Sequence, residues 1–363
     1  MKTTDEVWMR RALSLAEQGR GSTSPNPLVG AVLVRDGEVV GEGYHERAGG
    51  PHAEIRALAA AGEKARGATL YVTLEPCCHH GLTPPCTQAI LAAGVRRVVA
   101  ATIDPNALVN GKGIATLRAA GLEVEVGLLA DEAREQNRIY FHWITSGTPY
   151  VVLKWAMSAD GKVATVEGDS RYLSGEEALR EVHRLRSTLD AVLVGSQTVR
   201  TDDPLLTVRL VPGRQPRRVV LASRVDLPEE ARLFKAPGET IVVGALPLDE
   251  ERAERLRRFG ADVVGVPAFE GWVDLPSLLK LLGSRRITSL LVEGGPTVLG
   301  SFLDQGIFDE LHVVVAPLLL GGRGAPSPVA GKGVRRLEEA FRLGAPEIRI
   351  LGKDIWLTWR RKG

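Results

Sequence analysis

Sulfur, aromatic residues and net charge are all scarce in this chain. Of 363 residues, three are cysteine and three methionine, aromatic residues make up 5%, and the formal net charge at pH 7 is +2. So balanced a charge with so few aromatics disfavours binding of nucleic acid through a basic, base-stacking surface. The longest strongly apolar run, Val313 to Leu320, is too short to span a bilayer and contains Pro317. We therefore expect a globular protein with neither nucleic acid nor membrane as partner.

The three cysteines lie together in LEPCCHHGLTPPC, Leu74 to Cys86. The charged, amphipathic N-terminus lacks the apolar core of a secretory signal, so we expect a cytoplasmic protein. In a reducing compartment, clustered cysteines indicate a metal site or a catalytic thiol more often than a disulfide.

The first part of the chain alternates strands and helices, the pattern of a three-layer α/β domain. Two strands, Gly30 to Val34 and Val39 to Tyr44, flank Asp36-Gly37, a strong hairpin signal. The other elements expected here are helices over Asp5 to Gln18, His52 to Ala61, Pro84 to Ala93, Ile114 to Ala120 and Asp131 to Ile144, and strands over Ala68 to Leu74, Val95 to Thr102 and Leu122 to Val126.

A domain boundary is expected at Thr145 to Pro149, where turn-forming residues follow a helical run. The chain length also favours two domains, which we place at 1–146 and 147–363. Strand and helix patterns start again after the boundary, so the second domain is also expected to be α/β. Its expected elements are strands over Tyr150 to Met157, Ala191 to Gly195, Arg217 to Ala222, Ser289 to Gly295 and Ile348 to Arg361, the last as an antiparallel edge, and helices over Glu176 to Leu189 and Thr297 to Leu303.

A metal site is indicated by His52 and Glu54 at a helix start, followed after one strand by Cys77 and then Cys86. H-x-E followed by P-C and a further thiolate is the pattern of zinc-dependent deaminases. One imidazole and two thiolates leave a fourth zinc position for water, which zinc activates at neutral pH. Glu54 would then move protons between water and the leaving amine without binding the metal.

Two alternatives remain open on spacing alone. The common pattern places its second cysteine three residues after the first, where this chain has His80, so His80 and Cys86 compete as third ligand. A closed structural zinc site with four protein ligands is the other alternative, with Cys78, His79 or His80 as the fourth. It leaves the H-A-E helix start unexplained.

Further motifs lie in order along nearly the whole chain: NPLVGAVLV, GEGYH, GPHAE, TLEPCCHHGLTPPC, DPN with GKG, LKWAMSADGKVAT, VGSQTVRTDDPLLTVR and VEGGPTVLGSF. Together they make the chain similar to the bifunctional riboflavin-biosynthesis deaminase/reductase family. The resemblance implies a cytidine-deaminase-like domain followed by a dihydrofolate-reductase-like α/β domain.

The resemblance also implies roles in the first domain. It makes His52, Cys77 and Cys86 the zinc ligands and Glu54 the proton shuttle, which decides in favour of Cys86 over His80. Leu82 departs from the family, which commonly has a basic residue there to pair with substrate phosphate. Pyrimidine nucleotide contacts are implied for Asn26, His45, His79, Asp104 and Asn106, although on the residues alone turn-forming roles are favoured for Asn26, Asp104 and Asn106.

In the second domain no strand is followed by G-x-G-x-x-G. Strand SLLVEGG runs into a helix instead, which is an anion cradle or a plain turn. The resemblance implies NADPH there, and Lys154, a charge in an apolar strand, indicates a ligand or an ion pair. Implied cofactor positions are Ala156, Tyr172, Thr198, Asp202, Ser223, Gly295, Pro296, Thr297, Val298, Leu299, Gly300 and Ser301. Implied substrate positions are Ser170, Arg186, Leu206, Arg209 and Glu293, with Arg186 and Arg209 suited to a sugar phosphate. Lys154 is expected to contact the substrate as well, on its place in the strand.

The expected function is therefore zinc-dependent deamination of a 2,5-diamino-6-ribosylamino-pyrimidinone phosphate, followed by NADPH-dependent reduction of its ribosyl group to ribityl, by a homo-oligomer. A nucleic-acid base deaminase and a non-enzymatic zinc-stabilised interaction protein are the competing hypotheses. The first requires a basic groove with stacking aromatics, which the composition disfavours. The second requires a zinc site without an open position.

Overall fold

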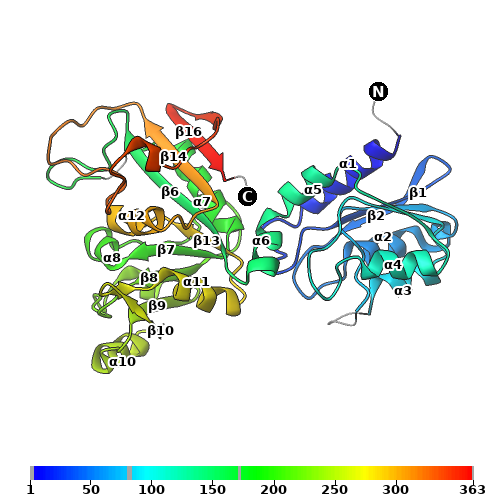
Figure 1. The fold of residues 1–363 in the computed structure, drawn as a ribbon, viewed down its shortest axis with the longest axis horizontal. Helices are drawn as coiled ribbons and strands as arrows, with labels where there is room; N and C mark the ends of the chain where they lie inside the picture. Colours follow the sequence, from blue (N-terminus) through cyan, green and yellow to red (C-terminus); the bar gives the residue numbers. More distant parts are fainter. Residues whose placement is uncertain (1–3, 80–83, 171–172, 362–363) are drawn as a thin grey trace. The chain divides into compact units, whose positions relative to one another are not determined.

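The computed structural model describes residues 4–79, 84–170 and 173–361. The chain divides into two compact units, Met1–Gly147 and Thr148–Gly363, each with its own sheet (Figure 1). No helix among the described residues is long and apolar enough to cross a membrane.

The sheet of the first unit has the order β2-β1-β3-β4-β5. Strand β1 runs antiparallel to both its neighbours, and β3, β4 and β5 are parallel to one another. The strands are β1 (Gly30–Arg35), β2 (Glu38–Tyr44), β3 (Thr69–Val72), β4 (Arg97–Ala100) and β5 (Glu123–Val126); the helices are α1 (Thr4–Glu17), α2 (Ala53–Ala61), η1 (Gly62–Ala65), α3 (Cys86–Ala92), α4 (Lys112–Ala119), α5 (Ala130–Gln136) and α6 (Arg138–Ser146).

Helices cover both faces of this sheet. Because side chains alternate along a strand, Ala31 and Leu33 of β1 pack with α2, α3 and α4, whereas Val32 and Val34 pack with α1 and α5. The expected three-layer α/β domain is thus confirmed, with a fully buried core on each side of the sheet.

One helical run expected in this unit is two helices. The prediction over Asp131 to Ile144 was wrong as a single element, because α5 ends at Gln136 and α6 begins at Arg138. The residue between them, Asn137, accepts a hydrogen bond from Leu28 N with Oδ1 (2.8 Å) and donates Nδ2 to Leu28 O (2.9 Å). A side chain that forms two hydrogen bonds with the backbone of a distant residue favours a break in the helix at its own position.

The sheet of the second unit has the order β10-β9-β8-β7-β13-β6-β14-β16-β15. Strands from β10 to β14 are parallel, and β16 and β15 form an antiparallel edge. The strands are β6 (Tyr150–Ser158), β7 (Ala191–Gly195), β8 (Arg217–Leu221), β9 (Thr240–Ala245), β10 (Ala261–Val266), β13 (Ser289–Val292), β14 (Glu310–Ala316), β15 (Glu347–Leu351) and β16 (Asp354–Arg360), with a separate hairpin of β11 (Ala268–Phe269) and β12 (Trp272–Val273).

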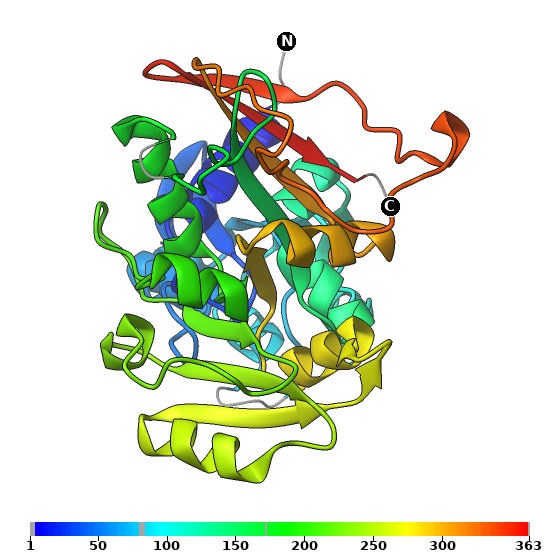
Figure 2. The ribbon, with the colours of Figure 1, turned by 90° about the vertical axis from the view of Figure 1, so that its left-hand side faces the viewer.

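Figure 2 shows the red C-terminal strands and the yellow-green β9–β10 pair at opposite edges of this sheet. Leucines of α11 and α12 pack on one face against β6, β7 and β13, and α7 packs on the other against Val314 and Trp356. The helices are α7 (Glu176–Thr188), α8 (Ser196–Asp202), α9 (Arg232–Lys235), α10 (Glu250–Arg258), α11 (Leu275–Ser284), α12 (Pro296–Asp304) and the short η2 (Leu337–Glu339).

The C-terminal strand expected over Ile348 to Arg361 is a hairpin. It turns at Gly352, which has φ +62°, so that Leu351 pairs with Asp354. The antiparallel edge is confirmed, but a single strand was wrong, because the alternating pattern continues on both sides of a turn that glycine permits.

Candidate active sites

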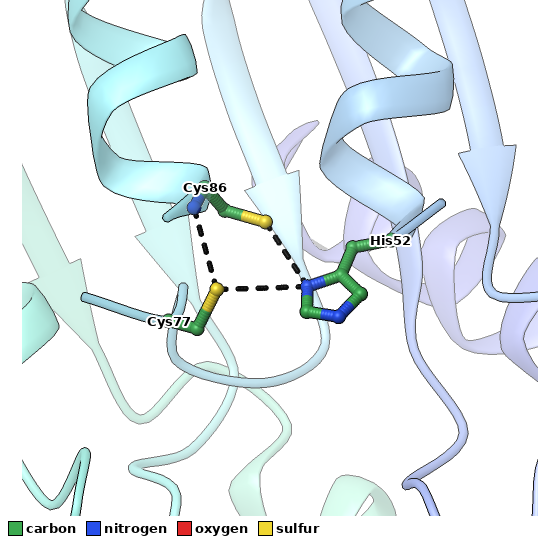
Figure 3. Close-up of side chains that lie close together, drawn as sticks. All are labelled: His52, Cys77 and Cys86. Atoms are coloured by element: carbon green, nitrogen blue, oxygen red, sulfur yellow. Dashed lines mark hydrogen bonds between the residues drawn. The ribbon is translucent and has the colours of Figure 1, made fainter. Parts of the chain in front are cut away.

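Three side chains converge at the carboxyl end of β3 (Figure 3). His52 immediately precedes α2, Cys77 lies in the loop after β3, and Cys86 begins α3. His52 Nδ1 lies 3.2 Å from Cys86 Sγ and 3.6 Å from Cys77 Sγ. The ligand atoms of all three lie within 4.8 Å of one another.

These separations fit zinc. Bonds of about 2.3 Å to sulfur and 2.0 Å to nitrogen at a tetrahedral angle put nitrogen and sulfur ligands about 3.5 Å apart. The described residues supply no fourth His, Cys, Asp or Glu ligand to this group. Of the alternative ligands, Cys78 lies near Leu108 O (4.0 Å), and His80 is outside the described residues.

The electrostatics of the two thiols favour metal binding. A hydrogen bond from Cys86, together with His52 and the Cys86 backbone N–H (3.3 Å), lowers the pKa of Cys77 against the effect of its burial. The Cys77 thiolate and burial in turn raise the pKa of Cys86. The Cys77 thiolate therefore disfavours ionisation of the buried Cys86 thiol, and a dication would hold both as thiolates.

Glu54 is the second residue of α2 and is 3% exposed. Burial raises the pKa of its carboxyl, and the nearby His52 opposes that shift. Its side chain also interacts with Cys86. A buried carboxyl beside the metal ligands, itself outside the three-ligand group, has the position of a proton carrier.

Asn26 and His45 form a pair next to this centre. His45 is buried, its Nδ1 lies 3.1 Å from Pro51 O and its Nε2 lies 3.0 Å from Asn26 Nδ2. Because a carbonyl only accepts, Nδ1 carries the proton and Nε2 accepts from the amide of Asn26. Burial lowers the pKa of His45, in keeping with a neutral ring, which meets the His52 ring edge-on at 5.5 Å.

Asp104 and Asn106 lie in the loop after β4. Asp104 Oδ1 accepts from Asn106 N (2.9 Å), and Asn106 Oδ1 accepts from Leu108 N (3.0 Å). Tyr140 donates its hydroxyl to Asp104 Oδ1 (3.1 Å), and burial raises the pKa of the Asp104 carboxyl. Both side chains have the turn-forming contacts favoured by the residues alone, within a loop that approaches the metal centre through Glu75.

His79 follows the paired cysteines and influences Asp104 electrostatically. Its Nδ1 is buried without a hydrogen-bond partner among the described residues, a position that a bound polar ligand would satisfy. Leu82, the departure from the family pattern, lies outside the described residues.

A second polar cluster lies where β6 and β13 adjoin. Leu153 pairs with Val292, so Lys154 and Glu293 follow at neighbouring positions. Arg186 of α7 binds Glu293 through two hydrogen bonds, Nε to Oε1 at 2.7 Å and Nη2 to Oε2 at 2.8 Å. The carboxyl end of a parallel sheet is where α/β proteins place ligands.

Charge pairing dominates this cluster. Burial alone would raise the pKa of Glu293, but Arg186 and Lys154 outweigh it and lower the pKa to about 2. Burial lowers the pKa of Lys154, and Glu293 opposes that shift. Arg186 was expected to suit a sugar phosphate, yet two of its nitrogens bind Glu293 and Nη1 donates to Thr207 O (3.3 Å).

The loop of Leu206 and Arg209 lies beside this cluster. Leu206 is buried with φ +53°, a strained conformation for a branched residue. Arg209 donates its backbone N–H to His183 Nδ1 (2.9 Å) and its Nη1 to Thr207 Oγ1 (2.8 Å). Its guanidinium is exposed, so Arg209 retains donors for a phosphate.

The expected cofactor segment runs from the end of β13 into α12. A Cβ on Gly294 would meet Val194 Cα at 2.4 Å, and Gly295 has φ +30°. Only glycine permits so close a strand-to-helix turn, and the N-terminus of α12 that follows is a candidate anion site, with Thr297 N–H as its first donor because Pro296 has none. Ala156 lies on β6, and Thr198 and Asp202 lie on α8. Ser223 follows β8, and its Oγ accepts from Val273 N (3.2 Å). Ser170 is exposed, and Tyr172 lies outside the described residues.

Sequence reasoning missed four side chains that hold these sites: Glu75, Tyr140, His183 and Thr207. Only His183 carried a signal, since it lies three residues before Arg186 and so on the same helix face. The other three act through contacts that no local pattern encodes.

Two family models match the chain. The cytidine and deoxycytidylate deaminase zinc-binding region matches residues 2–102, and the RibD C-terminal domain matches residues 149–357. The zinc-binding match contains His52, Cys77 and Cys86. The chain thus combines a deaminase domain of zinc-hydrolase type with a reductase domain of dihydrofolate-reductase-like fold, which a nicotinamide cofactor fits.

Curated relatives match over the full length. The riboflavin biosynthesis protein RibD of Aquifex aeolicus is 46% identical over 363 residues, which cover 99% of both chains. The Escherichia coli protein is 44% identical over 97% of this chain and 98% of its own. Among solved structures, Acinetobacter baumannii RibD is 38% identical with a TM-score of 0.89 and 99% coverage of both chains. The Thermotoga maritima deaminase/reductase is 35% identical with a TM-score of 0.86 and 98% coverage of both. The chain belongs to the RibD family of bifunctional riboflavin-biosynthesis enzymes, a zinc-dependent deaminase joined to a reductase.

Proposed function

We propose that domain 1–146 deaminates 2,5-diamino-6-ribosylamino-4(3H)-pyrimidinone 5′-phosphate and that domain 147–363 then reduces the ribosyl group with NADPH. The observation that carries the first activity is the convergence of His52, Cys77 and Cys86 beside buried Glu54. The second is supported by the Lys154, Arg186 and Glu293 cluster beside the glycine turn into α12.

In the deaminase site, His52, Cys77 and Cys86 would hold zinc, which supplies an activated water at neutral pH. Glu54 takes a proton from the attacking water and delivers it to the exocyclic amine, which leaves as ammonia. The neutral ring of His45 accepts a hydrogen bond from the amide NH₂ of Asn26 and so orients that side chain. The carbonyl oxygen of Asn26 is then free to accept from N–H donors of the pyrimidine. His79, Asp104 and Asn106 line the remaining side, with the orphaned Nδ1 of His79 as a substrate contact.

In the reductase site, the glycine turn and α12 would hold NADPH, which would supply a hydride to C1′ of the ribosyl group in its ring-opened imine form. A proton is then needed to complete the amine. Lys154 lies next to Glu293 and is the candidate donor of that proton. Arg186 fixes the Glu293 carboxylate, which accepts from sugar hydroxyls, and Arg209 binds the phosphate.

NADPH rather than NADH is supported by the residues after β8. Ser223 is followed by the exposed Arg224, and an arginine near the end of this strand suits a 2′-phosphate. Arg224→Ala should therefore raise KM for NADPH and leave KM for NADH unchanged. Equal effects on the two would contradict this assignment.

We also propose a homo-oligomer in the cytoplasm. Ile348 and Ile350 of the edge strand β15 are 61% and 67% exposed, and they share a sheet face with Ile355. Pairing with a second copy would cover this apolar edge. Ile350→Lys should then lower the mass measured by light scattering, and a wild-type protein that is already a monomer would refute the proposal. A reducing compartment keeps the ligand thiols available.

The test supplies the diaminopyrimidine nucleotide and NADPH and follows ammonia release and NADPH oxidation separately. Glu54→Ala should abolish ammonia release, and a chelator should do the same while reduction of separately supplied deaminated intermediate continues. Ammonia release undiminished in Glu54→Ala would sink the deaminase assignment. NADPH oxidation that does not depend on the deaminated intermediate would sink the reductase assignment.

A further inference from the structure

Glu75 lies between β3 and the metal ligand Cys77 and is 4% exposed. It accepts four backbone hydrogen bonds. Oε2 accepts from Asp104 N (3.3 Å) and Gly111 N (2.8 Å), and Oε1 accepts from Gly113 N (2.8 Å) and Ile114 N (3.1 Å).

These bonds join two loops that are otherwise separate in sequence. One loop carries Cys77, and the other runs from Asp104 into the first turn of α4. The backbone of Glu75 adds a further tie, from its N–H to Thr102 O at 2.9 Å. A buried carboxylate that accepts several N–H groups is held strongly in one place, because each bond to a charged acceptor is stronger than a neutral one.

The approach of the two loops is close enough to exclude side chains. A Cβ on Gly113 would lie 2.0 Å from Pro76 O, the carbonyl next to Cys77. The segment Pro76–Cys77 and the start of α4 therefore form one packed unit, with the Glu75 carboxylate as its polar centre.

We propose that Glu75 is a positioning residue that fixes the distance between the zinc ligands and the substrate loop of Asp104 and Asn106. The inference rests on the proposed function, since it requires that this loop contact the substrate. Glu75 itself touches neither metal ligand atoms nor reacting atoms. Its effect is on where the pyrimidine nucleotide is held relative to the attacking water.

Glu75→Gln tests this with little change in shape. A glutamine amide keeps one acceptor oxygen, and its NH₂ group then faces two backbone N–H donors in place of an acceptor. We expect the KM for the deaminase substrate to rise about tenfold, the scale of one lost hydrogen bond to a charged group, with a smaller fall in kcat. Zinc content and reductase activity should stay at wild-type values. Glu75→Ala removes both acceptor oxygens, and with them all four hydrogen bonds, and should have a larger effect in the same direction.

Asp5→Asn is the matched control. Asp5 is an acid of the same domain that binds Arg97 (2.8 Å) and accepts from Tyr71, away from the substrate loop. It should lower the melting temperature without changing KM. A purely structural role for Glu75 would give the same pattern as Asp5→Asn, and would overturn the inference. So would a loss of zinc that accounts for the loss of activity, because Glu75 would then act through Cys77.

Asn106→Ala separates this inference from the proposed function. If Asn106→Ala raises KM and Glu75→Gln does not, the positioning role of Glu75 is wrong, and the assignment of the loop as a substrate contact is retained. If Asn106→Ala leaves KM unchanged, the assignment of the loop fails, and the role of Glu75 fails with it. A rise in KM for both variants, with zinc retained, supports both.

Discussion

Replacing Glu293 with glutamine should destabilise the reductase domain strongly, because it leaves Arg186 without its charge partner. The two side chains are 10% and 13% exposed and share two hydrogen bonds of 2.7 and 2.8 Å. Removal of one partner from a buried pair costs about 3–5 kcal/mol. Burial alone would raise the pKa of Glu293, yet Arg186 and Lys154 hold it at about 2, down from 4.5. At roughly 1.4 kcal/mol for each pKa unit, this corresponds to about 3 kcal/mol, in agreement.

The sign of the pH dependence provides a second check. A carboxyl with a lowered pKa stabilises the folded state above its unfolded pKa of 4.5, and that contribution is lost as the pH falls through about 2. The difference between wild type and Glu293→Gln should therefore be full at pH 7 and shrink below pH 4.5.

The assay is urea unfolding of the full chain, followed by tryptophan fluorescence at pH 7 and pH 3.5. Glu181→Gln is the control. Glu181 lies on α7, as Arg186 does, and pairs with Arg184 and Arg349, whose side chains are 58% and 41% exposed. Pairs with exposed partners contribute about 1 kcal/mol or less. If Glu293→Gln costs no more than Glu181→Gln at pH 7, the reasoning about the buried pair is wrong.

Two further predictions concern the side chains that hold the sites. Burial, Arg186 and Arg209 lower the pKa of His183 from 6.5 to about 4, so the wild-type protein should lose stability as the pH falls from 6.5 to 4. His183→Asn should reduce this dependence of the unfolding free energy on pH, measured by urea unfolding. An unchanged dependence would contradict the assignment. Asn137→Ala removes both hydrogen bonds to the Leu28 backbone. It should lower the free energy of unfolding by about 1–3 kcal/mol, because it leaves buried backbone groups unsatisfied. The measurement is the melting temperature of the deaminase domain, which should fall, with little change in the unfolding transition of the reductase domain.

Local pattern was informative wherever a function depends on residue type and short spacing. His52 and Glu54 at a helix start, with Cys77 and Cys86 around the next loop, indicated a zinc site, because few types of side chain bind zinc. The pair Asp36-Gly37 between two apolar runs predicted the hairpin of β1 and β2, since both residues of such a tight turn need a positive φ, here 52° and 81°.

The sequence misled where a turn or a break depends on a distant partner. Asn137 divides a helical pattern because its amide binds Leu28, 109 residues earlier. The C-terminal pattern contains a hairpin at Gly352 because β16 pairs with β14 on one side and β15 on the other. Strands β9, β10 and β14 were not expected as strands, since short apolar runs do not distinguish a strand from a buried helix segment.

The sequence by itself determined which chemistry this protein can perform, because the types of ligand residue, the glycine turns and the order of the motifs are properties of the local sequence. Only the tertiary structure decided how the groups are used. Arg186 binds Glu293, 107 residues away, so two of its nitrogens point to protein rather than to a phosphate. Glu75 gathers four N–H groups from residues 104 to 114. Such pairings follow from which strands and loops become neighbours, and this depends on the packing of the whole domain rather than on any local spacing.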